Sequence, residues 1–346
     1  MKKCVPLAAV SLLSAVSTLA AVFLAAGFAV GQDVVYIAAG SEGGQMKVGG
    51  QVVDYDGRQL LINVAGGLQK SFPAQRVLRV ETQYGRQHLD ADANFAQGRF
   101  NQALALYQRA MQSEARRWVR RRIIAQWVWC YRALGQADAA GEAFLLLIRD
   151  DPNTLHFDCI PLTWLTRQPA AAVERSARQW LGREEPAAVL LGASQMLSTG
   201  ERATALAKLR ELSAASDRRI AQLAMAQSWR ADPATVDAET LRRRRLDIEQ
   251  MPELLRAGPY FVLGSALLRQ QQWEQAALAL LRAPILYPRQ RDVAAQALAD
   301  AGRAMEKLGR NNEALRLYRE LSGRFPDQTR PVAEASSRME SMTREE

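Results

Sequence analysis

Histidine and cysteine are scarce in this sequence of 346 residues, which holds only 2 His and 3 Cys. Acid–base, nucleophilic and metal-dependent chemistry relies on these two residue types, so most familiar enzyme classes are disfavoured. His88 and His156 lie far apart in the sequence, and neither has a cluster of cysteines or carboxylates around it at the spacing of metal ligands. Phosphate-binding loops, nucleophile elbows and dinucleotide fingerprints are missing as well. We therefore expect a protein that is not an enzyme and that has no cofactor and no metal site.

Charge is missing from one long stretch at the N-terminus. After Met1-Lys2-Lys3 no charged residue occurs from Cys4 to Val30, and this run is rich in Ala, Val and Leu. A positive start, a long apolar run and small residues near its end are typical of a signal peptide, and the run is also long enough to span a bilayer. Residues 1–32 are therefore expected to be a cleaved signal peptide or an uncleaved membrane anchor. Both alternatives place the remaining chain across the inner membrane, in the periplasm or cell envelope.

Residues 33–82 show the pattern of a small β module. Five short runs rich in Val, Ile and Leu are separated by turn signals such as Asp56-Gly57 and Gly66-Gly67. Five strands in about fifty residues suit a small barrel, and the pattern resembles SH3-like or Sm-like barrels. Its positive and negative charges cancel, which disfavours RNA binding and favours a docking or packing module.

Residues 84–346 repeat a pattern of small and large residues that is typical of packed helical hairpins. In a well-matched unit a Gly is followed by Ala at +5, an aromatic residue at +9 and Pro at +17, as in Gly135, Ala140, Phe144 and Pro152. The small residue allows two helices to approach, and the large residue fills the space beside it. The same spacing recurs, completely or in part, at positions 98, 200, 271 and 309.

The spacing between these positions predicts the number of hairpins. Two gaps are about twice as long as the others, so we expect degenerate units around 155–183 and 220–256. The count is then about seven hairpins, followed by a capping helix over about 331–343. The unit length and residue types resemble the tetratricopeptide repeat, over most of residues 84–328. The expected fold is mainly α: a leader, a small β barrel over 33–82, and a right-handed helical solenoid over 84–346.

The resemblance implies a binding groove lined by the first helix of each hairpin, which takes an extended peptide or a helix of a partner. The groove positions carried over from well-matched units are Arg122, Trp129, Arg132, Phe261, Leu268, Arg269, Arg303 and Lys307. Aromatic and arginine side chains often dominate binding energy, so an acidic or aromatic-bearing ligand is expected. The Lys and Asn set with which some family members hold a peptide carboxylate is missing at these positions. The same side chains would alternatively cover neighbouring helices.

Two arginine runs offer a rival binding surface. They comprise Arg116, Arg117, Arg120, Arg121, Arg242, Arg243, Arg244 and Arg245. Such runs suit an anionic envelope polymer, lipid head groups or, less readily in an exported protein, nucleic acid. Acidic residues stand close by, so ordinary solvated helix faces are the other interpretation.

Cys130 and Cys159 are the two cysteines outside the leader. An exported chain meets an oxidising space, and both residues are expected on first helices of adjacent units, so a disulfide between them is one alternative. Two buried free thiols are the other. Taken together, the sequence predicts an exported, non-catalytic scaffold that binds another protein or peptide, with membrane anchoring left open and nucleic acid as an unlikely partner.

Overall fold

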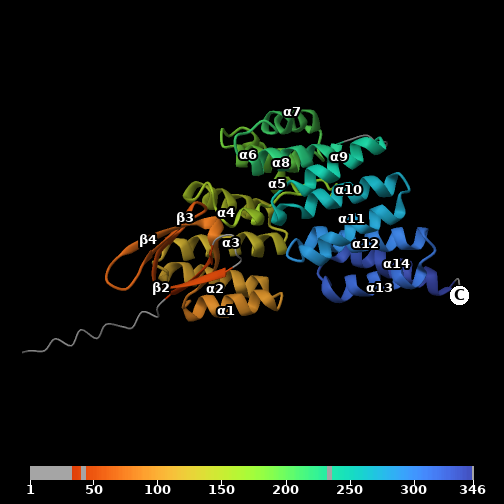
Figure 1. Cartoon of the computed structure of the whole chain (residues 1–346). Helices are drawn as coiled ribbons and strands as arrows, with labels where there is room; N and C mark the ends of the chain where they lie inside the picture. Colours follow the sequence, from red (N-terminus) through yellow and green to blue (C-terminus); the bar gives the residue numbers. More distant parts are fainter. Residues whose placement is uncertain (1–32, 40–43, 232–235, 345–346) are drawn as a thin grey trace, which may run out of the picture.

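The computed structural model describes residues 33–39, 44–231 and 236–344. The predicted leader, residues 1–32, lies outside the described residues. Within the described ranges, no helix is both long enough and apolar enough to cross a membrane. Figure 1 shows a small sheet beside the first helices and a curved array of helices that runs from there to the C-terminus.

The β module is a five-stranded antiparallel sheet with the strand order β4-β3-β2-β1-β5. Its strands are β1 (Asp33–Ala39), β2 (Gly44–Tyr55), β3 (Gln59–Asn63), β4 (Gln69–Pro73) and β5 (Val77–Glu81), with a 3₁₀ turn over Ala74–Arg76 before β5. The Asp56 carboxylate accepts the backbone N–H groups of Arg58 and Gln59, which closes the turn expected between β2 and β3. The strands β4 and β5 form no ladder with each other among the described residues, so the closed barrel stays a prediction.

The rest of the chain is an array of helices, which follow one another in antiparallel hairpins. The helices are α1 (Arg86–Ala96), α2 (Phe100–Ser113), α3 (Arg117–Ala133), α4 (Ala137–Asp150), α5 (Ala171–Leu181), α6 (Pro186–Met196), α7 (Arg202–Leu212), α8 (Arg218–Ser228), α9 (Ala238–Glu249), α10 (Ala257–Arg269), α11 (Trp273–Leu286), α12 (Arg291–Lys307), α13 (Asn311–Arg324) and α14 (Thr329–Arg344). Among the described residues, five of the seven expected hairpins are complete packed pairs. In a sixth, α9 packs on α10 more than on α8, and α14 takes the place of the predicted capping helix. The fold is a tetratricopeptide-like solenoid preceded by a small β module.

The local sequence explains the hairpins. Gly98, Gly135 and Gly309 have φ near +70° in the turn between the two helices of a pair, a conformation that costs glycine nothing. In the unit that has no glycine, Gln271 adopts φ +60° at the equivalent place. The helices then approach closely: a Cβ on Gly302 of α12 would lie 2.3 Å from the ring of Tyr318 on α13.

The third unit departs from the prediction because it has no first helix. Residues 151–170 run as an extended segment with one 3₁₀ turn over Phe157–Cys159, and only the second helix, α5, is formed. Pro161 and Pro169 remove backbone donors and disfavour helix in the residues before them. The stretch between these two prolines is too short for a stable helix. The segment is nevertheless part of the core, since Phe157, Cys159 and Trp164 are buried.

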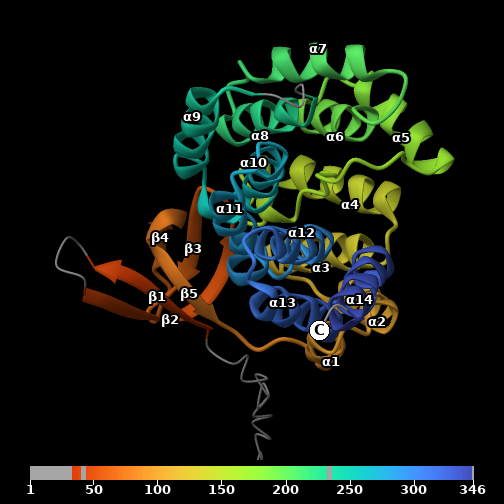
Figure 2. The same cartoon turned by 90° about the vertical axis from the view of Figure 1, so that its right-hand side faces the viewer.

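The sheet and the first hairpins form one body. Val35, Ile37 and Leu60 of the sheet share a buried cluster with Tyr107 of α2 and Ile123 of α3. Figure 1 shows the sheet on the side of α1–α4 that faces away from α10–α14. Figure 2, turned by 90°, shows that the array bends round so that α12 and α13 return to the region of α1–α3. Hydrogen bonds from Arg289 to Gln126 of α3, and from Arg132 of α3 to Gln290, join these distant parts of the chain.

Candidate partner-binding surfaces

The eight predicted groove residues lie on first helices, but the structure divides them into two groups. One group lies on α3 and the other on α10 and α12. The α3 group is Arg122, Trp129 and Arg132. The second group is Phe261, Leu268, Arg269, Arg303 and Lys307. The surroundings of each group decide whether a partner can reach it.

Trp129 is covered by the chain itself. Its side chain is only 5% exposed, and the guanidinium groups of Arg132 and Arg289 lie 4.7 and 4.8 Å from its ring centroid. Arg289 belongs to the loop between α11 and α12, and its Nη2 also donates to the side-chain oxygen of Gln126 on α3, at 2.7 Å. The expectation that Trp129 is open to a partner is therefore wrong.

Arg132 is also occupied within the chain. Its guanidinium donates to the carbonyl oxygens of Cys159 and Ile160, at 3.4 and 3.1 Å, and to the side chain of Gln290. Asp292 lies 3.9 Å away. Burial lowers the pKa of the Arg132 guanidinium, so the carbonyls and the nearby carboxylate are needed to hold its charge. Arg132 therefore fastens one part of the chain to another, and it also lines a cleft of about 370 Å³ that Arg289 and Asp292 share. Its role in binding a partner stays a prediction.

Arg122 is the most accessible member of the α3 group, but it too has partners. It stacks over the ring of Tyr84 at 5.1 Å from the centroid and lies 3.6 Å from the Asp92 carboxylate. These contacts hold the start of α1 against α3. The α3 part of the predicted groove thus consists of intramolecular contacts.

Residues 151–170 occupy the first-helix face in place of a ligand. The Ser194 hydroxyl of α6 both accepts the Thr163 N–H, at 3.0 Å, and donates to the Thr163 carbonyl, at 3.2 Å. Gln227 of α8 donates to the same carbonyl at 3.0 Å, and Arg230 donates to that of Leu165 at 3.1 Å. Because this segment is neither helix nor strand, side chains of the surrounding helices supply the partners that its buried backbone needs. This is the way an extended peptide would be held, with the peptide contributed by the chain itself.

Four of the second group line a cleft between α10, α12 and α14 of about 360 Å³. We call it the C-terminal cleft. Its lining residues are Ser265, Leu268, Arg269, Trp273, Asp300, Arg303, Lys307 and Arg338. The structure therefore brings together Leu268, Arg269, Arg303 and Lys307, as the groove prediction required. Phe261 is not among them, because its side chain is buried in the core of the array.

Four cations line the C-terminal cleft, and two of them form ion pairs with described carboxylates. Arg303 pairs with Asp300 at 2.6 Å, and Arg338 pairs with Glu306 at 2.7 Å. Burial raises the pKa of Asp300, so its carboxylate depends on Arg303 for stabilisation. Arg269 and Lys307 are exposed, and neither forms an ion pair with another described residue. A ligand with a carboxylate would find these two charges beside the apolar surface of Leu268 and Trp273.

The first arginine run is used to build the fold. Arg121 is only 5% exposed on its side chain and bridges Asp54 of the sheet, at 2.9 Å, and Asp150 at the end of α4, at 2.6 Å. Arg117 binds the same Asp150 carboxylate, and the paired guanidinium groups lower its pKa. Arg116 binds Glu114 at 2.8 Å. Arg117 and Arg120 are the exposed members of the run.

The second run points in several directions because consecutive helical residues are spread around the helix axis. Arg242 and Arg245 are exposed and pair with Glu239, at 2.6 Å, and Glu249, at 3.3 Å. Arg244 is buried, with its guanidinium 5.2 Å from the ring centroid of Trp229. Arg243 is exposed. Neither run is thus a continuous patch of free positive charge.

Cys130 and Cys159 are both buried free thiols, so the disulfide alternative is not the one that the structure shows. Cys159 was expected on a first helix, but it lies on the extended segment instead. Burial raises the pKa of the Cys130 thiol to about 12 and that of Cys159 well above its usual range. Among the described residues, no group of three or more His, Cys, Asp or Glu side chains could hold a metal ion.

Sequence reasoning missed several residues that shape these surfaces. Trp273 had been found as a marker of the repeat, but its place at the rim of the cleft was not expected. Arg289 and Gln290 lie in a turn that carries no motif, and their contacts join residues more than 130 positions apart. Only the arrangement of whole hairpins reveals such contacts.

Comparison with known proteins agrees with the hairpin architecture. Residues 296–327, which fall on α12 and α13, match the family model described as tetratricopeptide repeat. No curated protein matches the chain. The match and the repeated hairpins support a tetratricopeptide-like fold, and repeats of this type generally serve as non-catalytic scaffolds for protein interaction.

Proposed function

We propose that this chain is an exported, non-catalytic scaffold that binds an acidic or aromatic-bearing segment of a partner protein in the C-terminal cleft. The observation that carries the proposal is the convergence of four predicted groove residues on one cleft. Arg269 and Lys307 would bind the acidic groups of the partner, and Leu268 and Trp273 would contact its apolar side chains. Charged groups of this kind chiefly raise the association rate and fix the register of the bound segment.

Export to a bacterial envelope rests on the leader alone. The proposal is that residues 1–32 direct the chain across the inner membrane and are then either cleaved or kept as an anchor. The β module would dock the scaffold or pack against it. Its shared core with the first helices supports a packing role, since the sheet and α1–α3 contribute to one buried cluster.

Binding of an anionic polymer, a lipid head group or nucleic acid is the rival function, and the structure favours it less. Arg116, Arg117 and Arg121 are engaged with carboxylates of the fold itself. A polymer would have to displace these pairs before it could bind the first run. Its binding would also weaken steeply as salt is added, which provides a simple way to recognise it.

The test is capture of a partner from envelope extract with the full chain as bait. Arg269→Glu combined with Lys307→Glu should lower recovery of the specific partner about tenfold, because both free cations of the cleft are reversed. A matched control is Arg86→Glu combined with Lys70→Glu, which changes the net charge equally at two exposed positions far from the cleft. Equal loss of the partner in both double variants would show that only net charge matters and would refute the cleft as the site.

A further inference from the structure

The exposed apolar side chains of this protein are concentrated on one stretch. Among the described residues, twelve large hydrophobic side chains are exposed, and five of these lie between positions 246 and 286. The five are Leu246, Leu254, Leu278, Ile285 and Leu286. Each of them is between 54% and 66% exposed. Single exposed apolar residues are common on any surface, but a concentration of them marks an interaction site.

This stretch contains a groove that is distinct from the C-terminal cleft, and Leu278 is the one of the five that lines it. We call it the α9–α11 groove, because α9 and α11 form its walls and α10 forms its floor. Its volume is about 380 Å³, and its floor consists of Tyr260, Leu263 and Leu267. The helix α10 packs against both α9 and α11, and Figure 2 shows the three helices next to one another. The groove is therefore bounded by the second helices of two successive hairpins, on a different face from the first-helix groove.

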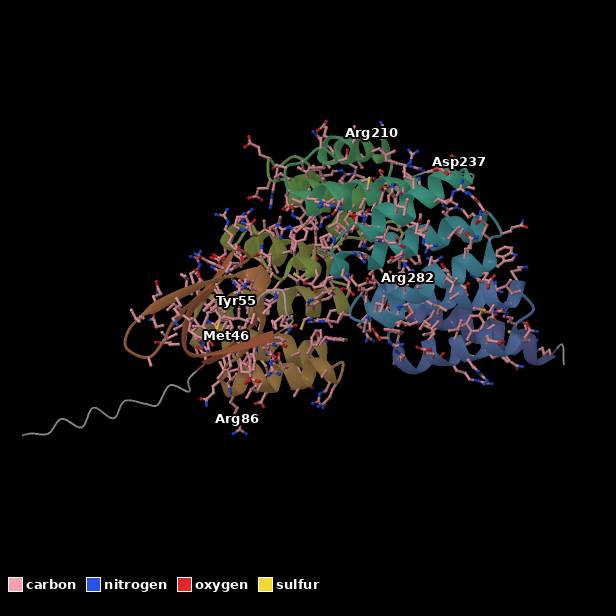
Figure 3. The ribbon with its side chains drawn as sticks, in the orientation of Figure 1. Met46, Tyr55, Arg86, Arg210, Asp237 and Arg282 are labelled. Atoms are coloured by element: carbon pink, nitrogen blue, oxygen red, sulfur yellow. The ribbon has the colours of Figure 1, made fainter. Side chains whose placement is uncertain are left out.

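The charged side chains that line the α9–α11 groove are all positive. The charged residues that line it are Arg242, Arg245 and Arg282, and no acidic residue lines it. Arg282, labelled in Figure 3, lies 4.4 Å above the ring of Tyr260 and forms no ion pair with another described residue. The pairs of Arg242 and Arg245 with glutamates on α9 are solvent-exposed, and such pairs contribute little stability. All three arginines can therefore turn to an acidic ligand at small cost.

The spacing of the apolar side chains suits a helical ligand. Leu278 and Arg282 line the groove at positions i and i+4 of α11, and the exposed Ile285 at i+7 continues the same side of the helix beyond it. A helix laid between α9 and α11 would cover this side and the apolar floor, in the way that amphipathic helices bind grooves between helices. The arginines at the rim would meet acidic residues that flank the apolar stripe of such a helix.

We propose that the α9–α11 groove docks an amphipathic helix of a partner protein, with leucine-type residues on its apolar face and Glu or Asp at its flanks. This site is independent of the C-terminal cleft. A scaffold with both surfaces would hold two partners on one chain and so bring them together. The function of the α9–α11 groove does not depend on the partner proposed for the cleft.

A synthetic helical peptide tests the proposal directly. The probe is a fluorescent peptide of about 18 residues, five turns of helix, with Leu on one face and Glu at its flanks. Its binding to the full chain is followed by fluorescence anisotropy. A peptide with Lys in place of each Glu should bind at least about tenfold more weakly, because the rim is positive. A shuffled peptide of the same composition should lose binding because its apolar stripe is broken.

Two matched variants locate the bound peptide. Leu278→Asp should weaken binding about tenfold or more, since it places a charge in the apolar contact. Leu68→Asp is the control, because Leu68 is 65% exposed in the β module where Leu278 is 64% exposed in the groove. Both leucines are on the surface, so neither substitution disturbs the core. The control should bind the peptide as the unmodified chain does.

Other outcomes would overturn the proposal. Equal binding by the Leu278→Asp and Leu68→Asp variants would exclude the groove. Loss of binding in Arg269→Glu with Lys307→Glu, but not in Leu278→Asp, would place the peptide in the C-terminal cleft. Self-association of the unmodified chain that Leu278→Asp abolishes would identify a second copy as the occupant. Sedimentation with vesicles of anionic lipid that Leu278→Asp abolishes would identify a membrane surface.

Discussion

Replacing Gly258 by alanine should destabilise the native protein, but only while Trp164 is present. Gly258 lies in the first turn of α10, and Trp164 lies on the extended segment 151–170. A Cβ built on Gly258 would lie 1.9 Å from Cε2 and 2.1 Å from Cδ2 of the Trp164 ring. Carbon atoms in contact are about 3.5 Å apart, so the ring would have to move by about 1.6 Å. Overpacking of this kind costs about 1–3 kcal/mol.

Trp164→Ala, the substitution of the other contact partner, supplies the second arm of a double-mutant cycle. Trp164 is buried, so Trp164→Ala should cost about 3–5 kcal/mol through lost burial and the cavity that remains. With the ring gone, Gly258→Ala meets no clash and gains the higher helix propensity of alanine, which is worth up to about 1 kcal/mol. The two effects should therefore fail to add, and the double variant should be about 1–4 kcal/mol more stable than additivity predicts.

The measurement is urea unfolding of the four proteins, followed by circular dichroism and compared at a common slope. Additivity within about 0.5 kcal/mol would refute the reasoning. It would mean that the segment 151–170 does not pack on α10, and the first-helix face would then be open. The cycle thus tests the feature that most changes the expected binding site.

Three further predictions address the core and its titration. Arg121→Ala should lower the free energy of unfolding by about 2–4 kcal/mol, because it leaves Asp54 and Asp150 without the guanidinium that bridges them. The control, Arg120→Ala at an exposed neighbouring position, should change the free energy of unfolding by less than about 0.5 kcal/mol. Equal effects of the two substitutions in urea unfolding would contradict the bridge. Burial lowers the pKa of His156 to about 4, below its unfolded value of about 6.5. Below pH 6.5 the unfolded chain therefore binds a proton that the folded chain does not. The free energy of unfolding falls by about 3 kcal/mol at most as the pH drops from 6.5 to 4. The His156→Gln variant should lack this part of the pH dependence in urea unfolding, and parallel pH profiles of the two proteins would show that the imidazole is not buried in neutral form. Cys130 and Cys159 should not react with a thiol reagent at pH 8 in the native protein and should react after denaturation, since burial keeps both as neutral thiols. Rapid reaction of these two cysteines in the native protein would contradict their burial.

The repeated hairpins could be predicted because their signals are local. The spacing from Gly135 to Phe144 sets the turn and the contact across one pair of helices, and the structure has the hairpin there. The extended segment in the third unit could not be predicted in the same way. Its prolines show where helix is disfavoured, but the path taken by Phe157 and Trp164 depends on side chains from α6, α8 and α10.

The binding site was predicted in part for a related reason. The repeat pattern identifies which residues of α10 and α12 face the inner side, and Arg269 and Lys307 indeed line a cleft there. The same pattern also selects Trp129 and Arg132, whose place in the repeat is equivalent. They differ because Arg289 and residues 159–160 cover them.

The sequence by itself determined the array of hairpins and the small β module, since each of these elements is specified by residues close together in the chain. Only the tertiary structure decided which face of the array is open. The contact between Arg132 and Gln290 joins residues 158 positions apart, and it exists because the array bends far enough to meet its own beginning. That bend is the sum of the packing angles at every helix pair. No local pattern reveals such a sum, so the occupied and open surfaces could be assigned only from the complete fold.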